Sequence, residues 1–139
     1  MVLGVYLGDK SALARMHLEP VRSRLEPLIN RGLVFICAAT EYELLYSAKN
    51  LGDYDRIKST LTSSFPWASM GEDLWKRALE IQRELATESQ HRSASMVDLL
   101  LSVVAANESL TVLHYDRDFE TIAEVTGQPT EWVVPAGTV

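Results

Sequence analysis

The sequence predicts an α/β sandwich with a mainly parallel sheet. Short apolar runs alternate along the chain with longer amphipathic segments, which is typical of parallel strands covered by helices. The 139 residues suffice for one compact domain and are too few for two ordinary ones, so residues 1–139 are predicted to form a single domain. No internal repeat, linker or low-complexity stretch interrupts the alternation.

Four apolar runs predict strands. The first ends at Gly8-Asp9, and the second contains Cys37, which is expected to be a small buried hydrophobe. A further short segment at residues 65–68 is expected to be extended. The predicted strands cover residues 2–7, 33–37, 111–114 and 131–134.

Seven segments carry helical patterns. Glu19-Pro20 opens one of them and Gly32 ends it. Thr40, with Glu43 three residues later, is a candidate capping box. The most apolar segment is expected to be a central helix, and it contains a single acid, Asp98. The predicted helices cover residues 10–18, 19–31, 40–48, 53–64, 72–88, 94–107 and 117–125.

Composition limits the class of protein without deciding its partner. No apolar run approaches the roughly 18 residues of a membrane span, and the first residues lack a signal-peptide pattern. A single cysteine forms no internal disulfide, so a soluble cytoplasmic protein is expected. The net charge of −6 argues against a nucleic-acid partner. That argument fails if the acids gather at a metal site, because bound cations reverse the local sign.

Acidic side chains follow the predicted strands at the points where those strands end. Asp9 follows the first strand, Asp116 and Asp118 follow the third, and Glu43 lies in the helix after the second. Because the carboxyl ends of parallel strands meet at one edge of a sheet, we expect these side chains to lie close together. Asp98 lies near the start of an apolar helix that contains no lysine or arginine to pair with it.

Gathered carboxylates repel one another unless cations are present, and Mg²⁺ and Mn²⁺ prefer such oxygen ligands and bridge phosphate oxygens. The five acids therefore support the hypothesis of a Mg²⁺- or Mn²⁺-dependent phosphodiester site. Structural roles are the alternative: a turn residue for Asp9, a capping-box acid for Glu43, and helix-start acids for Asp98, Asp116 and Asp118.

Four stretches of the chain together form a recognisable pattern of acids and apolar residues: residues 6–13, 40–48, 97–101 and 113–119. In these stretches the chain resembles PIN-domain ribonucleases of the VapC toxin type. The resemblance implies a PIN-like three-layer α/β/α sandwich with a short, mainly parallel central sheet. It covers nearly the whole length and includes a tail at residues 126–135. Gly8, Val97 and His114 depart from the family's pattern, and Gly8 is expected to loosen the end of its strand.

The resemblance implies four catalytic, metal-binding acids: Asp9, Glu43, Asp98 and Asp116. Asp118 supports or replaces Asp116 as a ligand. Ser11 matches a hydroxyl that helps hold the metal waters, with a helix N-cap as its alternative role. Glu41, two residues before Glu43 on the same helix, is expected to point away from the site.

The implied activity is that of a toxin endoribonuclease, in which Mg²⁺ or Mn²⁺ activates a water that attacks a phosphodiester of tRNA, rRNA or mRNA. The implied partners are a VapB-type antitoxin and a second copy of the chain. Helices 19–31 and 53–64 carry apolar faces that could form the contact with the second copy or could equally belong to the core. Five basic residues are candidates for contacts with RNA phosphates: Lys10, Arg15, Lys49, Arg92 and Arg117.

Three further possibilities stay open. The first is a weak or inactive PIN-fold protein that mainly binds its antitoxin. The second is an aspartyl-phosphate phosphatase with Asp9 as nucleophile, although Ser11 stands where such enzymes carry a second Asp. The third concerns Trp67, Trp75 and Trp132, which either stack on bases or, as we expect, pack in the core or an interface.

Overall fold

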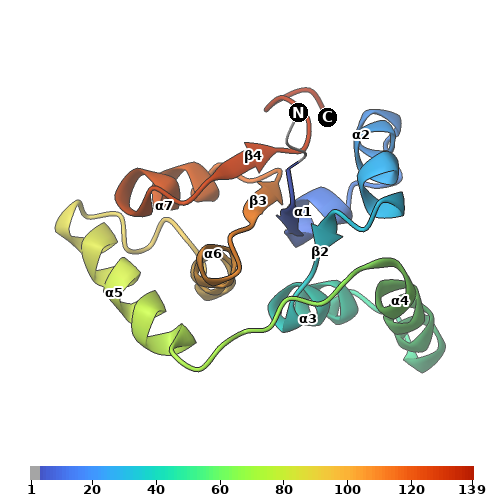
Figure 1. Cartoon of the computed structure of the whole chain (residues 1–139), viewed down its shortest axis with the longest axis horizontal. Coiled ribbons are helices and arrows are strands. Elements are labelled where there is room, and N and C mark those ends of the chain that lie inside the picture. The colour runs from blue at the N-terminus through green and yellow to red at the C-terminus, as the bar shows by residue number, and fades with distance from the viewer. Residues whose placement is uncertain (1–3) are drawn as a thin grey trace.

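Four parallel strands form one sheet in the order β2-β1-β3-β4 (Figure 1). The structure is a computed structural model, and it describes residues 4–139. Every neighbouring pair in the sheet is parallel, so all strands end at the same edge. The strands are β1 (Tyr6–Gly8), β2 (Val34–Phe35), β3 (Thr111–His114) and β4 (Thr130–Trp132).

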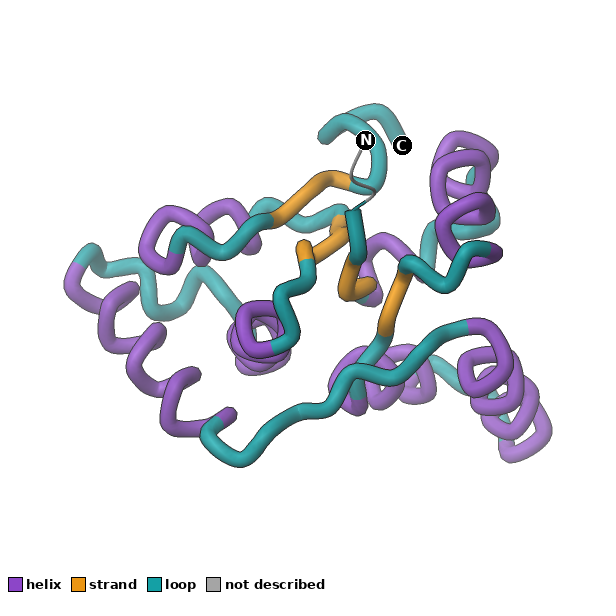
Figure 2. Tube along the Cα trace, in the orientation of Figure 1, coloured by secondary structure: helices purple, strands orange, loops and turns teal. Residues whose placement is uncertain are grey.

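Helices cover both faces of this sheet, as Figure 2 shows. Side chains alternate along each strand: Leu7 and Val112 belong to one buried cluster, whereas Tyr6 and Leu113 belong to the other. The three-layer α/β/α arrangement is therefore confirmed. The helices are α1 (Lys10–Leu13), α2 (Glu19–Asn30), α3 (Ala38–Tyr46), α4 (Leu51–Ser64), α5 (Leu74–Thr87), α6 (Met96–Asn107) and α7 (Asp118–Thr126).

Helix α6 is the central helix that its composition predicts. Its residues from Asp98 to Ala105 are all buried, and they pack with α5, α7 and one face of the sheet. Val21 and Leu25 of α2 pack on the opposite face and are fully buried. The apolar face predicted for dimer contacts on helix 19–31 is therefore part of the core.

Two predicted boundaries near the start of the chain are wrong. The strand predicted at residues 2–7 begins at Tyr6, because both partner strands begin opposite Tyr6, at Val34 and Thr111; residues 1–3 lie outside the described part. The helix predicted at 10–18 ends at Leu13, where the Arg15 guanidinium donates to the Ser11 carbonyl at 2.6 Å and the following turns tighten.

Gly8 does not loosen the end of β1. It pairs with Leu113, and a Cβ at this position would lie 3.1 Å from Leu13 Cδ1 and 3.3 Å from Val34 Cγ1. These side chains already fill the space that a bulky residue would take.

Helix α3 begins at Ala38, and the capping box predicted for Thr40 and Glu43 is wrong. Thr40 lies inside the helix and is fully buried, and its hydroxyl donates to the Gly8 carbonyl at 2.9 Å. This bond connects α3 to the end of β1, the strand from which Asp9 emerges.

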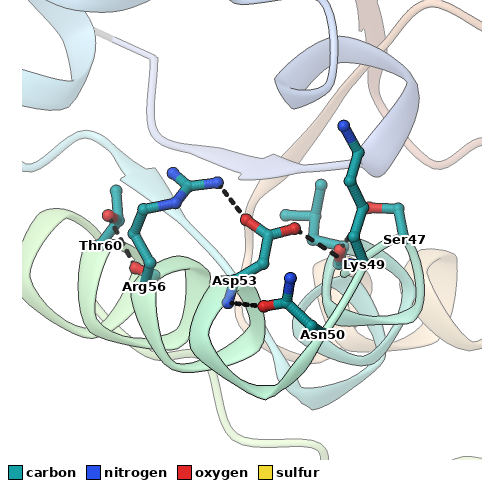
Figure 3. Close-up of polar contacts among 7 residues, drawn as sticks. Ser47, Lys49, Asn50, Asp53, Arg56 and Thr60 are labelled. Carbon is teal, nitrogen blue, oxygen red and sulfur yellow. Dashed lines mark hydrogen bonds and ion pairs between the residues drawn. The ribbon is translucent and has the colours of Figure 1, made fainter.

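Helix α4 begins with a cap that the sequence did not reveal (Figure 3). The Asn50 side chain accepts a hydrogen bond from the Asp53 amide at 2.8 Å. The Asp53 carboxylate accepts from the Lys49 amide at 3.1 Å and from Arg56 at 2.5 Å, and the Arg56 hydrogen bond lowers the pKa of Asp53. This exposed network holds the α3–α4 connection.

The remaining elements confirm the predicted order, with ends displaced by one or two residues. Gly32 lies just past the end of α2, as expected, and has a φ of +69°. Cys37 is fully buried, also as expected. The extended segment around Trp67 forms a parallel bridge with Ile36. None of the helices within residues 4–139 combines the length and apolar character that a membrane crossing requires.

We predict that Thr40→Val lowers the free energy of unfolding by about 1–3 kcal/mol, because the buried Gly8 carbonyl loses its hydroxyl donor. Urea unfolding measures the change. Thr60→Val is the matched control, since the Thr60 hydroxyl donates to the Arg56 carbonyl on an exposed helix face. The control should change stability by less than about 0.5 kcal/mol. Equal losses in both variants would contradict the role given to Thr40.

Candidate metal centre

A cavity of about 310 Å³ lies at the carboxyl edge of the sheet, and carboxylates from five positions line it. It is built where β1 and β3 end and where α6 begins, with Glu43 from the middle of α3, so it draws on segments far apart in the sequence. All six predicted site residues line this cavity: Asp9, Ser11, Glu43, Asp98, Asp116 and Asp118.

Asp9 and Ser11 form the part of the site that follows β1. Asp9 is the N-cap of α1, and its Oδ2 accepts from the Ser11 amide at 2.9 Å and from the Ser11 hydroxyl at 2.5 Å. Its other oxygen, Oδ1, is buried and has no hydrogen-bond partner among the described residues. The N-cap and turn roles considered for these residues are therefore real, but they leave one carboxylate oxygen of Asp9 free for a ligand.

Asp98 has two roles at once. It forms a capping box with Ser95, in which the Asp98 amide donates to Ser95 Oγ and the Ser95 amide donates to Asp98 Oδ2, both at 3.2 Å. It is also buried and lines the cavity. Ser95 was not among the predicted site residues; the signal for it is the pattern Ser-x-x-Asp before an apolar run.

Asp98, Asp116 and Asp118 form the tightest cluster of acids. One ligand oxygen from each lies within 4.8 Å of the other two, close enough that the three side chains could hold one metal ion between them. The Asp118 amide also donates to Asp116 Oδ1 at 2.9 Å, so the helix-start role of this pair is present as well. The geometry places Asp118 beside Asp116 in the cluster.

Two backbone amides of the loop after β3 donate hydrogen bonds to side chains, and these bonds hold the loop. The Tyr115 amide donates to Ser11 Oγ at 2.8 Å, and the Asp116 amide donates to His114 Nδ1 at 3.1 Å. The Ser11 hydroxyl thus connects Asp9 to the loop that carries Asp116. Neither contact had a visible signal in the sequence, because each joins a side chain to a backbone amide.

Helix α3 presents its two acids in different directions. Glu43 is half-buried and lines the cavity. Glu41 is buried elsewhere, in an ion pair with Lys58 of α4 and next to Phe65 and Trp67. Glu41 therefore points away from the site, as expected from its spacing.

In the metal-free protein, burial disfavours the charged form of four carboxyl groups of the site and so raises their pKa values. Burial, with a contribution from Asp9, raises the pKa of Asp98 to about 7. Burial is also the main cause that raises the pKa of Asp9, Glu43 and Asp118, and the charge of Asp116 adds to each increase.

These features fit a divalent cation. A cluster of oxygen ligands, an unpartnered buried carboxylate oxygen and raised carboxyl pKa values all describe groups that lack a compensating positive charge. No histidine or cysteine belongs to the described cluster, so its chemistry is that of a hard, oxygen-preferring ion.

Two of the five candidate basic residues, Lys10 and Arg15, line the cavity. The Arg15 guanidinium is held 4.6 Å from the centre of the Tyr115 ring. Of the tryptophans, Trp67 and Trp75 are each 54% exposed, so they are not core residues, and the interface packing expected as the other possibility stays a prediction. Trp132 packs against His114 and Tyr115.

We predict that Asp98→Asn stabilises the metal-free protein increasingly as the pH rises from about 4 to about 7. The Asp98 pKa is about 7 in the folded protein against an ordinary value of 3.8, so its stabilising contribution is complete below pH 3.8 and is lost as the pH rises through 7. The difference in unfolding free energy between variant and wild type should grow by roughly 2–4 kcal/mol over this range, since one pKa unit is worth about 1.4 kcal/mol.

Urea unfolding in EDTA at several pH values measures this difference. Burial lowers the pKa of His114 to about 4, so His114 contributes in the opposite direction between pH 4 and 6.5, but it does so in both proteins and cancels. Asp55→Asn, on the exposed face of α4, gives the baseline. A difference that does not change with pH would contradict the burial assigned to Asp98.

Two sequences from Mycobacterium tuberculosis (strain ATCC 25618 / H37Rv) are similar over nearly their full length. Ribonuclease VapC21 is 43% identical over 133 residues, which cover 96% of each chain. Ribonuclease VapC51 is 42% identical over 134 residues, again 96% of each chain.

Solved structures share the fold at low sequence identity. VapBC2 from Rickettsia felis, bound to a DNA fragment from its promoter, has a chain that matches with a TM-score of 0.75 at 16% identity, covering 92% of this chain and 98% of that one. VapBC from Salmonella typhimurium, also bound to DNA, matches with a TM-score of 0.73 at 19% identity, covering 95% and 100%. Residues 6–125 match the PIN domain family. The chain therefore belongs to the PIN domain family and, within it, to the VapC-type proteins.

Proposed function

We propose that this chain is a divalent-metal-dependent endoribonuclease and the toxin of a toxin–antitoxin pair. The observation that carries the proposal is the convergence of five carboxylates from four separate segments on one cavity. The relatives of similar length that are named ribonucleases support the same activity. The proposal places the protein in the cytoplasm, where its RNA substrate is found.

The residues that would hold the metal are Asp9, Glu43, Asp98, Asp116 and Asp118, with Ser11 beside them. Mg²⁺ or Mn²⁺ held there would supply Lewis acidity for a phosphoryl oxygen and would activate water as the nucleophile. Asp98, Asp116 and Asp118 offer oxygens at the spacing of one ion, and Asp9 offers its unpartnered Oδ1. Ser11 keeps Asp9 in place by occupying Oδ2.

The RNA backbone would be held by Lys10 and Arg15, the two candidate cations that line the cavity. Lys49, Arg92 and Arg117 do not line it, and we assign them no role at the scissile phosphate. Arg15 is held in place by the Ser11 carbonyl and the Tyr115 ring, so it meets a phosphate at little cost in side-chain entropy. The class of RNA, whether tRNA, rRNA or mRNA, remains open in this proposal.

The proposed partners are a VapB-type antitoxin and a second copy of the chain. The structural relatives named VapBC support an antitoxin partner. The apolar residues of α2 are buried or partly buried and pack against the core, so a homodimer would need other surfaces. Trp75 and Leu79 of α5 are 54% and 62% exposed and lie one helical turn apart, which suits such a contact.

We predict that the purified chain cleaves single-stranded or structured RNA with Mg²⁺ or Mn²⁺ and stops when EDTA is added. Asp9→Asn and Asp116→Asn should each lower the cleavage rate by more than the roughly 10- to 100-fold that loss of an outer-shell partner costs. Gel-based cleavage assays measure the rate. Asp55→Asn, an exposed acid on α4, is the matched control and should leave the rate unchanged. Full activity of the Asp9 or Asp116 variant would refute the metal site.

We predict that expression of the chain alone arrests the growth of a bacterial host, and that Asp116→Asn at equal abundance does not. The reason is that unopposed RNA cleavage blocks protein synthesis. Growth curves with immunoblots measure both quantities. Unimpaired growth with folded, abundant wild-type protein would count against the toxin role and favour a chain that mainly binds its antitoxin. Co-expression with a small DNA-binding protein encoded next to it should restore growth.

A further inference from the structure

His114 is a buried side chain next to the site to which the proposed chemistry gives no task. We infer that His114 is a positioning residue, whose Nδ1 fixes the Asp116 backbone so that Asp116 and Asp118 present their carboxylates to the metal. This inference rests on the proposed function and deepens it, because it names the group that shapes one side of the metal site.

The hydrogen bond determines the form of the imidazole. The Asp116 amide lies 3.1 Å from His114 Nδ1, and a backbone N–H can only donate, so Nδ1 must be the unprotonated, accepting nitrogen. The ring hydrogen is then on Nε2, which is buried and has no hydrogen-bond partner within residues 4–139. The bond from the Asp116 amide is therefore the one hydrogen bond that the imidazole makes within the described residues.

Packing holds the ring in the orientation that this bond needs. His114 is fully buried, and its ring centre lies 5.0 Å from the centres of both the Phe119 and Trp132 rings. These neighbours come from α7 and β4, so the ring is clamped between two elements that flank the loop. Rotation of the ring away from Asp116 would require both elements to move.

The effect of the bond extends to Asp118. Asp116 Oδ1 accepts from the Asp118 amide at 2.9 Å, so the position of the Asp116 backbone sets the start of α7. Tyr115, the preceding residue, is held by Ser11 at 2.8 Å. The loop is thus fixed at two successive amides, and His114 supplies the contact nearer to the metal ligands.

The test separates the hydrogen-bond acceptor from the packing. His114→Leu and His114→Phe keep an apolar side chain of broadly similar size but have no acceptor. His114→Asn places its Oδ1 at the same number of bonds from Cβ and keeps an acceptor, but it loses the ring. Calorimetric titration of the purified, RNA-free protein with Mn²⁺ measures metal binding, and thermal unfolding in EDTA measures stability.

We expect His114→Leu and His114→Phe to bind Mn²⁺ roughly 10- to 100-fold more weakly, as loss of an outer-shell partner does, while unfolding near the wild-type temperature. His114→Asn should bind within about threefold of wild type while unfolding at a lower temperature, because it buries an amide and loses the ring contacts. The variants without an acceptor, His114→Leu and His114→Phe, would then lose metal affinity but keep their stability, whereas His114→Asn would keep metal affinity but lose stability. A purely structural role would not produce this pattern. His17→Leu, at an exposed histidine, is the control and should change neither.

Equal Mn²⁺ affinity in wild type, His114→Leu and His114→Phe would overturn this inference and leave the proposed function intact. A tenfold loss in His114→Asn would overturn it as well, whether or not the other two variants fold. If wild type itself binds no Mn²⁺, the proposed metal-dependent function fails, and the inference fails with it.

Discussion

The pairing of β1 with β3 is the interaction on which the site depends. Gly8 pairs with Leu113, and the Asp9 amide donates to the Leu113 carbonyl at 3.0 Å, so the two strands end side by side. This pairing brings Asp9 and Asp116 to the same cavity although they lie at opposite ends of the sequence. Thr40 and Ser11 then connect α3 and the loop after β3 to the same strand ends.

Assembly of the site works against the stability of the protein. Carboxyl groups are brought together and buried, and this burial raises the pKa of Asp9, Glu43, Asp98 and Asp118. The fold offsets part of the cost locally, through the capping box at Asp98 and the Ser11 hydrogen bonds to Asp9. A bound cation would offset the rest of this burial cost, so ion binding and proton release from these carboxyl groups are expected to occur together.

The sequence predicted the order of elements, the parallel sheet and the set of acids that meet at its edge, because strand and helix periodicity and strand-end positions are local signals. It did not predict what Thr40 does, since the Thr40–Gly8 contact joins residues far apart in the sequence. It did not predict where α1 ends either, because the Arg15–Ser11 bond there joins a side chain to a backbone carbonyl, which leaves no pattern in the sequence. Asp98 shows the limit most clearly: its helix-start role and its place in the site looked exclusive, yet the carboxylate belongs to a capping box and also lines the cavity. The assignment of residues 1–139 to one domain stays a prediction.

The central position of β3 in the sheet has a consequence for synthesis of the protein on the ribosome. A nascent chain that ends before Thr111 already contains Asp9, Glu43 and Asp98, but it has no β3 against which β1 can pair and no Asp116 to complete the cluster. The acidic cluster can therefore form only after the segment from Thr111 to Asp118 has left the exit tunnel, late in the synthesis of the chain.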